Sequence, residues 1–337
     1  MQFNKNDMNL QHRINLMVAL GKYMQEDGPT WKNIILKANQ HNPWFIPDFI
    51  QLASTNIITK FLNKEALDKW IAQYKLDDDL NAKNIGLVMA GNIPLVGFHD
   101  FLTVFISGHT QTIKLSTKDD ILLTHLITKL YELDNETRNR VIIADMLKGC
   151  DAYIATGSNN SARYFEQYFS KYPHIIRKNK TSVAILTGNE SINELASLAD
   201  DIHLYFGLGC RNVTKIFVPE NYNFIPLIRS FDKYLYFKDH HKYNNNYDYQ
   251  LSIMLMNNIY YMTNGSTLLV ENESFFSPIS VLNYEYYKMG NIEASLQNLN
   301  DVQCLAGKGY ITFGQSQIPE LSSYADGIDT MQFLLTL

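Results

Sequence analysis

From residue 84 onward, short apolar runs alternate with amphipathic segments of helical spacing, and this alternation most constrains the fold. The stretch "NIGLVMAG" (84–91) has the composition of a buried strand, and "LVGFHDFLTVFISG" (95–108) has the pattern of a helix closed by Gly108. The same order then repeats in "TQTIKLS", "DDILLTHLITKLYEL", "AYIATG" and "NNSARYFEQYFSKY". Such alternation predicts a parallel sheet covered on both faces. We therefore expect an α/β fold.

A second alternating segment begins after "TSVAILTG" (181–188) and predicts a second domain. Residues 8–74, by contrast, show helical periodicity alone. We expect a first domain over residues 1–188 and a second domain over 189–312. The remaining segment, 313–337, either returns to the first domain or contributes to oligomerisation.

The bulk composition excludes several classes of protein. With 46% hydrophobic and 19% charged residues among 337, the chain is globular rather than disordered. Its net charge of −5 argues against a nucleic-acid partner, because phosphate binding needs a basic face. No apolar run reaches the roughly 18 residues of a membrane span. Three scattered cysteines (Cys150, Cys210 and Cys304) fit neither a disulfide framework nor a zinc site, so we expect a reducing cytoplasm and no bound metal.

One of these cysteines, Cys210, stands in the turn-forming stretch "FGLGCRN" (206–212). A lone cysteine is more often structural than nucleophilic. Here, however, Gly207 and Gly209 let the backbone approach a ligand, and Arg211 adds a positive charge that favours a thiolate. The preceding pattern, "SINELASLADDIHLYFG", predicts a helix that delivers the chain to this turn.

Three predicted strands end in small or polar residues, where parallel α/β sheets bind ligands. The first of these strands is followed by "GNIPLVG" (91–97), which is in isolation a plain turn between strand and helix. The second ends at Lys114, whose side chain could simply reach solvent. The third, "TGSNNSAR" (156–163), is either a helix cap or a turn that binds a phosphate or a ring at a helix N-terminus.

The order of these motifs resembles the aldehyde dehydrogenase superfamily and, within it, the acyl-CoA reductases of the bioluminescence (LuxC) type. The motifs that carry the resemblance are "GNIPLVG", "DAYIATGSNNSARYF" and "GLGCRNVTKIFVP", and it extends over residues 84–290. It implies an aldehyde-dehydrogenase-like fold of two parallel-sheet α/β domains, in which a Rossmann-like cofactor-binding domain precedes a catalytic domain with the cysteine loop.

The resemblance also assigns roles to individual residues. Cys210 falls on the nucleophile that takes up the acyl group, and Asn92 on the asparagine whose amide stabilises the oxyanion. Glu273 in "ESFFSP" is the candidate for the glutamate that holds the nicotinamide ribose, although pairing the proline puts Ser274 there. The full set implied to bind cofactor is Lys114, Ser116, Thr117, Gly157, Ser158 and Glu273.

Two departures from the family pattern bear on the reaction. Oxidising members carry a general-base glutamate in "ELGG", and we pair that motif with "AILTG" (184–188), which has Ile185 and Thr187 instead of a carboxylate. Without a base, water is poorly activated, and Glu190 is the nearest substitute. NAD-preferring members often place a glutamate three residues after the lysine. Thr117 and Lys118 stand there in this chain, which favours NADPH.

The resemblance thus implies NADPH-dependent reduction of an acyl thioester, carried by CoA or an acyl carrier, to an aldehyde through a thioester on Cys210. It implies that this cysteine meets thioester and cofactor at a domain interface. Two alternatives stay open: a CoA-acylating or oxidising aldehyde dehydrogenase, and a non-catalytic subunit that binds acyl groups or cofactor. A homo-oligomer and an acyl-transfer partner protein also stay open.

Overall fold

The computed structural model describes residues 8–78, 81–288 and 299–337. Its contacts divide the chain into unit 1, which ends at Asn179 and resumes with Pro319–Leu337, and unit 2, Lys180–Ile318. The division therefore lies earlier than the boundary expected after residue 188. The strand formed by Thr181–Ile185 pairs with later strands of unit 2, which draws this segment into the second unit.

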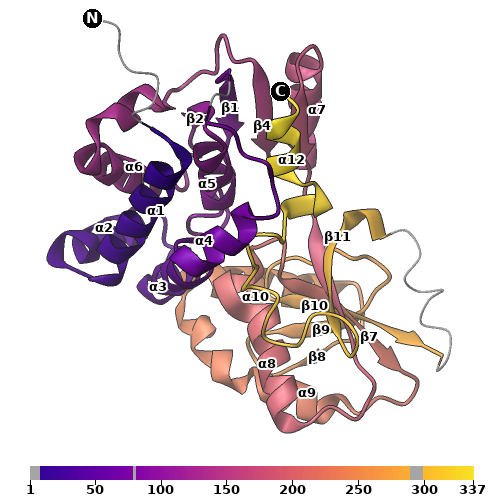
Figure 1. Cartoon of the computed structure of the whole chain (residues 1–337). Coiled ribbons are helices and arrows are strands. Elements are labelled where there is room, and N and C mark those ends of the chain that lie inside the picture. Colours follow the sequence, from indigo (N-terminus) through magenta and orange to yellow (C-terminus); the bar gives the residue numbers. More distant parts are fainter. Residues whose placement is uncertain (1–7, 79–80, 289–298) are drawn as a thin grey trace, which may run out of the picture. The chain divides into compact units, whose positions relative to one another are not determined.

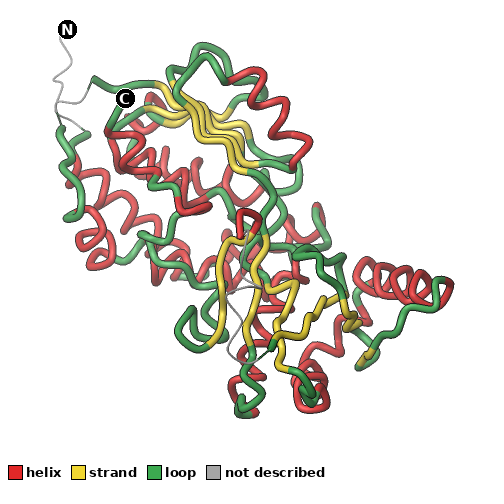
Figure 2. The backbone as a smooth tube through the Cα atoms, turned by 90° about the vertical axis from the view of Figure 1, so that its right-hand side faces the viewer, coloured by secondary structure: helices red, strands yellow, loops and turns green. Residues whose placement is uncertain are grey.

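Unit 1 is built on a five-stranded sheet in the order β3-β2-β1-β4-β5, and all its strand pairs are parallel (Figure 2). Two of these strands, β3 and β5, have only three and four residues and were not expected from the sequence. The strands are β1 (Asn84–Val88), β2 (Thr110–Lys114), β3 (Val141–Ile143), β4 (Ala152–Thr156) and β5 (His174–Arg177).

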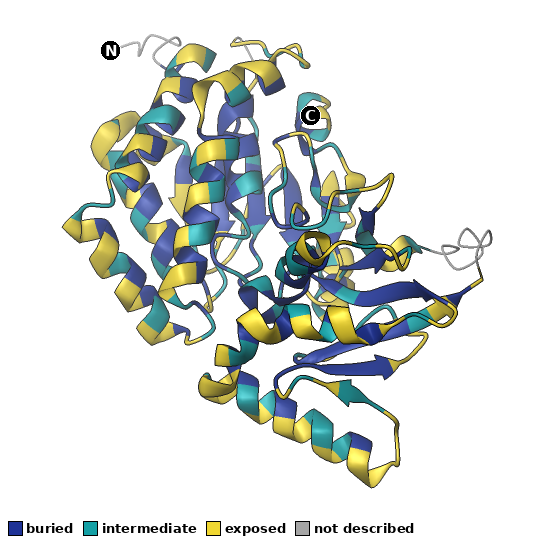
Figure 3. Ribbon diagram, turned by 90° about the horizontal axis from the view of Figure 1, so that it is seen from below, coloured by how far each residue is buried: buried dark blue, intermediate teal, exposed yellow. Residues whose placement is uncertain are grey.

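Helix α5 (Phe98–Ser107) is the central helix of unit 1 and is buried along most of its length (Figure 3). It packs against β1 and β2 on one side and against α1 on another. As expected, it ends at Gly108, whose φ of 93° is the left-handed conformation that glycine adopts readily. The other helices of unit 1 are α1 (Leu10–Gln25), α2 (Pro29–His41), α3 (Pro47–Asn56), α4 (Lys64–Ile71), α6 (Ile121–Leu133), α7 (Asn159–Phe169) and α12 (Thr330–Leu335).

Residues 319–337 belong to unit 1, as in one of the two expected alternatives, whereas 313–318 belong to unit 2. Helix α12 packs on α5 (Figure 1). The buried Arg177 guanidinium forms an ion pair with Asp100 of α5 and donates to Thr330 Oγ1 at 2.8 Å. One buried cation therefore joins the end of β5, α5 and α12.

Unit 2 contains a six-stranded sheet in the order β11-β6-β7-β10-β9-β8, which is parallel except for the antiparallel edge strand β8. The expected parallel character is thus confirmed for most of the sheet. The strands are β6 (Thr181–Ile185), β7 (Val213–Pro219), β8 (Met262–Thr263), β9 (Leu268–Glu271), β10 (Val281–Tyr287) and β11 (Val302–Gly307), and the helices are α8 (Ile192–His203), α9 (Phe224–Ser230) and α10 (His241–Met256).

Helix α8 ends at His203, whereas the sequence pattern predicted a helix through Gly207. The apolar pattern continues past this point, but Tyr205, Phe206 and Gly207 all have positive φ angles, of 56°, 57° and 74°. Left-handed residues cannot continue a right-handed helix. The chain therefore leaves the helix in a strained turn.

Across the three described ranges, no helix is at once long and apolar enough to cross a membrane.

Candidate active site

The carboxyl ends of β1, β2 and β4 meet at one edge of the unit 1 sheet. Val88 pairs with Lys114 of β2 and with Ala155 of β4, so the three strands end side by side. From β1 the chain continues to β2 and β3 on one side of that strand, and it then crosses to β4 on the other side. This reversal of strand order makes the edge a topological switch point. Lys114 is the last residue of β2, Gly157 directly follows β4, and Asn92 lies in the segment after β1, so the fold gathers these expected site residues at one edge.

The segment 115–120, which we call the cofactor loop after its expected role, is held by the end of helix α2. Thr117 and Lys118 are exposed, and Ser116 Oγ accepts the Lys118 N–H at 3.3 Å. From α2, His41 Nε2 lies 2.8 Å from the Thr117 carbonyl, and Asn42 Nδ2 donates to the Lys118 carbonyl at 3.1 Å. The loop thus has a fixed backbone and presents the side chains of Thr117 and Lys118 to solvent.

Gly157 and Ser158 form the turn that opens helix α7. Ser158 is the N-cap, and its Oγ accepts the Ser161 N–H at 3.2 Å, which confirms the helix-cap interpretation. A Cβ on Gly157 would lie 2.9 Å from Phe165 and from Ser161, so the tight turn requires glycine. A role of this turn in binding a cofactor ring stays a prediction.

The segment 91–97, which we call the Asn92 loop, packs directly on the cofactor loop. Asn92 is half-buried in it, and Leu95 adopts a φ of 57°. The Leu95 N–H donates to Asp119 Oδ2 at 2.7 Å. Sequence reasoning missed Asp119, because an acidic pair before an apolar run is typical of an ordinary helix start. The structure instead buries this carboxyl between the two loops.

In unit 2, Cys210 lies half-buried in the turn before β7, and the chain reaches it through strained backbone. Left-handed φ angles at Tyr205 and Phe206 are unfavourable by about 1–2 kcal/mol each. Phe206 is kept in place by ring contacts with Phe237 and His240, at centroid distances of 4.5 and 4.6 Å. Strain of this kind clusters at functional sites, where the surrounding structure maintains it.

Asn212 is the anchor of this cysteine turn, and it is fully buried. Its Oδ1 accepts the Gly209 N–H at 2.8 Å. Its Nδ2 donates to the carbonyls of Asp201 and Leu204, at 3.0 and 2.9 Å, so one amide ties the end of α8 to the turn. Sequence reasoning missed this residue as well.

Replacing Asn212 by alanine should destabilise the protein and loosen the turn. The change leaves a buried N–H and two buried carbonyls without their partner, and each unsatisfied group costs about 1–3 kcal/mol. Denaturant unfolding measures the loss. Asn257→Ala, which removes an exposed amide that donates to Ile253 O, is the control and should shift stability by under about 0.5 kcal/mol. Equal effects of the two variants would contradict the anchoring role.

The three cysteines occupy different environments. Cys150 and Cys304 are buried, and burial raises the pKa of both thiols, which disfavours the reactive thiolate. Arg211, expected to favour the Cys210 thiolate, interacts with Cys304 and partly offsets this effect there. Ser182 Oγ donates to the Cys210 carbonyl at 3.0 Å and also lies 2.9 Å from Cys304 Sγ. This side chain at the start of β6 therefore supports the cysteine turn.

The pairing of the general-base motif with "AILTG" is wrong for geometric reasons. Cys210 precedes β7, beside the start of β6, whereas residues 186–190 follow the end of β6. A Cβ on Gly188 would lie 3.3 Å from Pro219, the last residue of β7. The seven residues of β7 therefore separate this segment from Cys210 by roughly 20 Å, at about 3.3 Å per residue.

Glu190 is excluded as a substitute base for the same reason. Its carboxylate folds back on its own turn, where Oε1 accepts from Thr187 Oγ1 at 2.8 Å and Oε2 accepts from the Gly188 N–H at 3.1 Å. The segment that enters β6 beside Cys210 is "KNKTS" (178–182), which contains no carboxylate. This segment therefore offers Cys210 no carboxylate that could act as a base.

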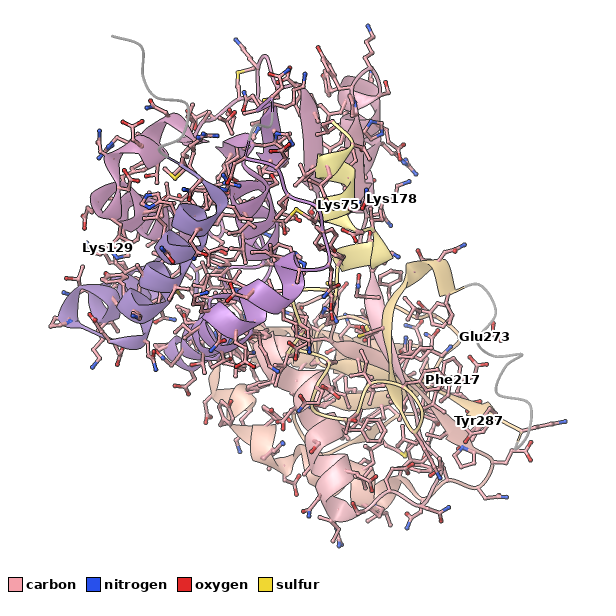
Figure 4. The ribbon with its side chains drawn as sticks, viewed as in Figure 1. Lys75, Lys129, Lys178, Phe217, Glu273 and Tyr287 are labelled. Carbon is pink, nitrogen blue, oxygen red and sulfur yellow. The ribbon has the colours of Figure 1, made fainter. Side chains whose placement is uncertain are left out.

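Glu273 lies in unit 2, in the connection 272–280 between β9 and β10, and its side chain is exposed (Figure 4). Polar side chains of β7 and β10 fix this connection. Lys215 Nζ donates to the Glu273 carbonyl at 2.6 Å, Thr214 Oγ1 to the Phe275 carbonyl at 2.6 Å, and Asn283 Nδ2 to the Ser274 carbonyl at 2.9 Å. Because Thr214 and Lys215 begin β7, the connection runs back toward the edge that carries Cys210.

In the part of the chain that the structure describes, no group of three or more His, Cys, Asp or Glu side chains could hold a metal ion.

Comparison with known proteins places this geometry in context. Residues 55–225 match the family model described as "Acyl-CoA reductase (LuxC)". No curated protein matches the sequence.

Solved structures of aldehyde dehydrogenases are similar in fold. Aldehyde dehydrogenase 21 from Physcomitrella patens, in complex with the product succinate, gives a TM-score of 0.68 at 11% identity, covering 90% of this chain and 74% of that one. The indole-3-acetaldehyde dehydrogenase AldA of P. syringae, in complex with NAD+ and IAA, gives 0.65 at 11% identity (88% and 72%). The glyceraldehyde-3-phosphate dehydrogenase GapN of Methanocaldococcus jannaschii, complexed with NADP, gives 0.63 at 12% identity (90% and 76%). The fold is that of the aldehyde dehydrogenases.

Proposed function

Because the chain belongs to the LuxC family of acyl-CoA reductases, we propose that it reduces an acyl thioester to an aldehyde with NADPH, through a thioester on Cys210. The observation that carries the proposal is the cysteine turn. It presents a half-buried thiol on strained, anchored backbone, beside a chain segment that lacks a carboxylate.

In the proposed reaction, the Cys210 sulfur attacks the thioester carbonyl carbon. The Asn92 amide donates to the oxyanion that develops there, and the tetrahedral adduct expels the CoA or carrier thiolate, which takes up a proton. Cys210 then holds the acyl group as a thioester. Hydride addition to this carbonyl gives a thiohemiacetal, which collapses to the aldehyde and returns the thiol. The reaction requires Asn92 and Cys210 to reach the same carbonyl.

The residues at the carboxyl edge of the unit 1 sheet fit a dinucleotide. An exposed lysine ends β2, a glycine that tolerates no Cβ precedes α7, and the helix N-terminus offers N–H groups to an anion. Lys114 would bind the adenosine ribose, and Gly157 and Ser158 would flank the nicotinamide end. When bound, the nicotinamide supplies the hydride. The similar folds named above include one complexed with NADP and one with NAD+, which supports a nicotinamide cofactor.

The absence of a carboxylate from segment 178–182, which enters β6 beside Cys210, favours reduction over hydrolysis. A general base usually contributes about 10²–10⁴ in rate, so water attacks the enzyme thioester slowly without one. The acyl group then persists until hydride arrives. Incubation with a panel of acyl-CoAs and NADPH, followed by aldehyde detection, tests the overall reaction. Free acid as the sole product would contradict the proposal.

Replacing Thr117 by glutamate should weaken NADPH binding by at least about fivefold and leave NADH binding nearly unchanged. Thr117 and Lys118 are exposed on the cofactor loop, and a carboxylate there would repel a 2′-phosphate by about 1 kcal/mol even in water. Equilibrium titration of both cofactors measures the change. Thr124→Glu, the same substitution at an exposed threonine on α6, is the control. An equal effect on both cofactors would show that the cofactor loop does not contact the 2′-phosphate.

A further inference from the structure

Asp119 belongs to both loops of the unit 1 site. Its own N–H donates to the Ser116 carbonyl at 3.0 Å, which makes it part of the cofactor loop. Its Oδ2 accepts the Leu95 N–H at 2.7 Å, which reaches into the Asn92 loop. The residue is only 7% exposed. A single buried carboxyl therefore joins the loop that carries the proposed oxyanion donor to the loop proposed to bind cofactor.

The two loops are in close contact around this carboxyl, with no space between them. A Cβ on Gly91 would lie 2.5 Å from Ser116 Oγ and 3.2 Å from Asp119 Cβ. Leu95 holds a φ of 57°, a conformation that needs support from its surroundings. The bond from Leu95 to Asp119 supplies such support three residues after Asn92. Movement of the Asp119 carboxyl would therefore shift the backbone of the Asn92 loop and change the position of Asn92.

The charge of Asp119 is poorly stabilised where it lies. Oδ1 is buried and has no hydrogen-bond partner among the described residues. Burial, with a smaller contribution from the Asp120 charge, raises the pKa of Asp119 from 3.8 to about 7. Two other charged or titratable side chains lie around the Asp119 carboxyl, Lys118 of the same loop and His41 of α2. His41 Nε2 lies 3.6 Å from Asp120 Oδ1. The carboxyl therefore changes charge near neutral pH.

We propose that Asp119 is a positioning residue that aligns Asn92 for acylation of Cys210 by fixing the Asn92 loop against the cofactor loop. The inference rests on the proposed function for the role of Asn92, whereas the link between the loops is a property of unit 1 alone. Protonated Asp119 suits the buried site. Ionisation strengthens the bond from the Leu95 N–H, but the cost of burying the charge is larger. Ionised Asp119 therefore draws water toward Oδ1, and alignment weakens as pH rises through about 7.

The test compares Asp119→Asn, which keeps an acceptor for the Leu95 N–H and carries no charge, with Asp119→Ala, which removes it. Asp119→Ala should slow acylation of Cys210 by about 10- to 100-fold, since a misplacement of about 1 Å costs on the order of 10² in rate. Asp119→Asn should stay within about threefold of the native protein at pH 6 and overtake it above pH 7, where only the native residue ionises. Thr137→Ala, a buried polar change in the turn after α6, controls for destabilisation.

Hydrogen exchange supplies a readout that does not depend on catalysis. The Asn92 loop should exchange faster in Asp119→Ala than in Asp119→Asn or Thr137→Ala, with the pH dependence of intrinsic exchange removed. If the native protein forms no acyl adduct on Cys210 but this exchange pattern holds, the proposed function fails and the link between the loops stands. Unchanged exchange in Asp119→Ala, or an acylation loss equal to that of Thr137→Ala, overturns the proposal.

Discussion

Replacing Cys210 by serine is expected to abolish the covalent acyl-enzyme and to bring aldehyde formation down to background. A thiolate is a strong nucleophile near neutral pH, whereas a serine hydroxyl needs an adjacent base that the segment 178–182 does not offer. Mass spectrometry of the protein after incubation with acyl-CoA detects the adduct directly. Cys150→Ser, at a buried cysteine of unit 1, is the matched control and should keep the adduct.

Labelling with iodoacetamide gives a second view of the same prediction. Cys210 should react first, because its thiol is only half-buried and the reagent can reach it. Cys150 and Cys304 are buried, and burial raises the pKa of both thiols. Peptide mapping at short reaction times gives the order. Equal labelling of all three cysteines, or full activity in the serine variant, would end the assignment of Cys210 as nucleophile.

Replacing Asn92 by alanine should slow acylation of Cys210 by about 10²–10³, the usual cost of losing one oxyanion donor. Binding of NADPH should change little, because the cofactor loop keeps its contacts with α2. Single-turnover mass spectrometry follows the acylation rate, and thermal unfolding of the same preparation follows stability. A lower melting temperature with an unchanged acylation rate would make Asn92 a turn residue without a chemical role.

The sequence predicted the first sheet well because its long strands and helices alternate locally. The order of "GNIPLVG", Lys114 and "TGSNN" along the chain then placed three site segments at one sheet edge, where the structure has them. The domain boundary was displaced because the location of Thr181–Ile185 depends on pairing with β7 and β11, which lie far along the sequence. Such long-range pairing leaves no local signal.

The residues that support the site were beyond sequence reasoning. Asn212 and Asp119 act through bonds to backbone groups of other segments, so nothing in their immediate neighbours marks them. The general-base motif was paired with a stretch that runs past the carboxyl end of β6, whereas Cys210 lies beside the start of β6. Only the direction of β6 beside β7 shows which end carries Cys210.

In the proposed mechanism, the acyl group persists on Cys210 until hydride arrives, because no base activates water there. The most direct test of this mechanism is intact-protein mass spectrometry after addition of acyl-CoA without NADPH, followed by addition of NADPH. We expect a persistent increase of one acyl mass on the peptide that contains Cys210, and its discharge as aldehyde when NADPH is added. Hydrolysis of the adduct to free acid within a few turnovers, before any NADPH is present, would contradict the account.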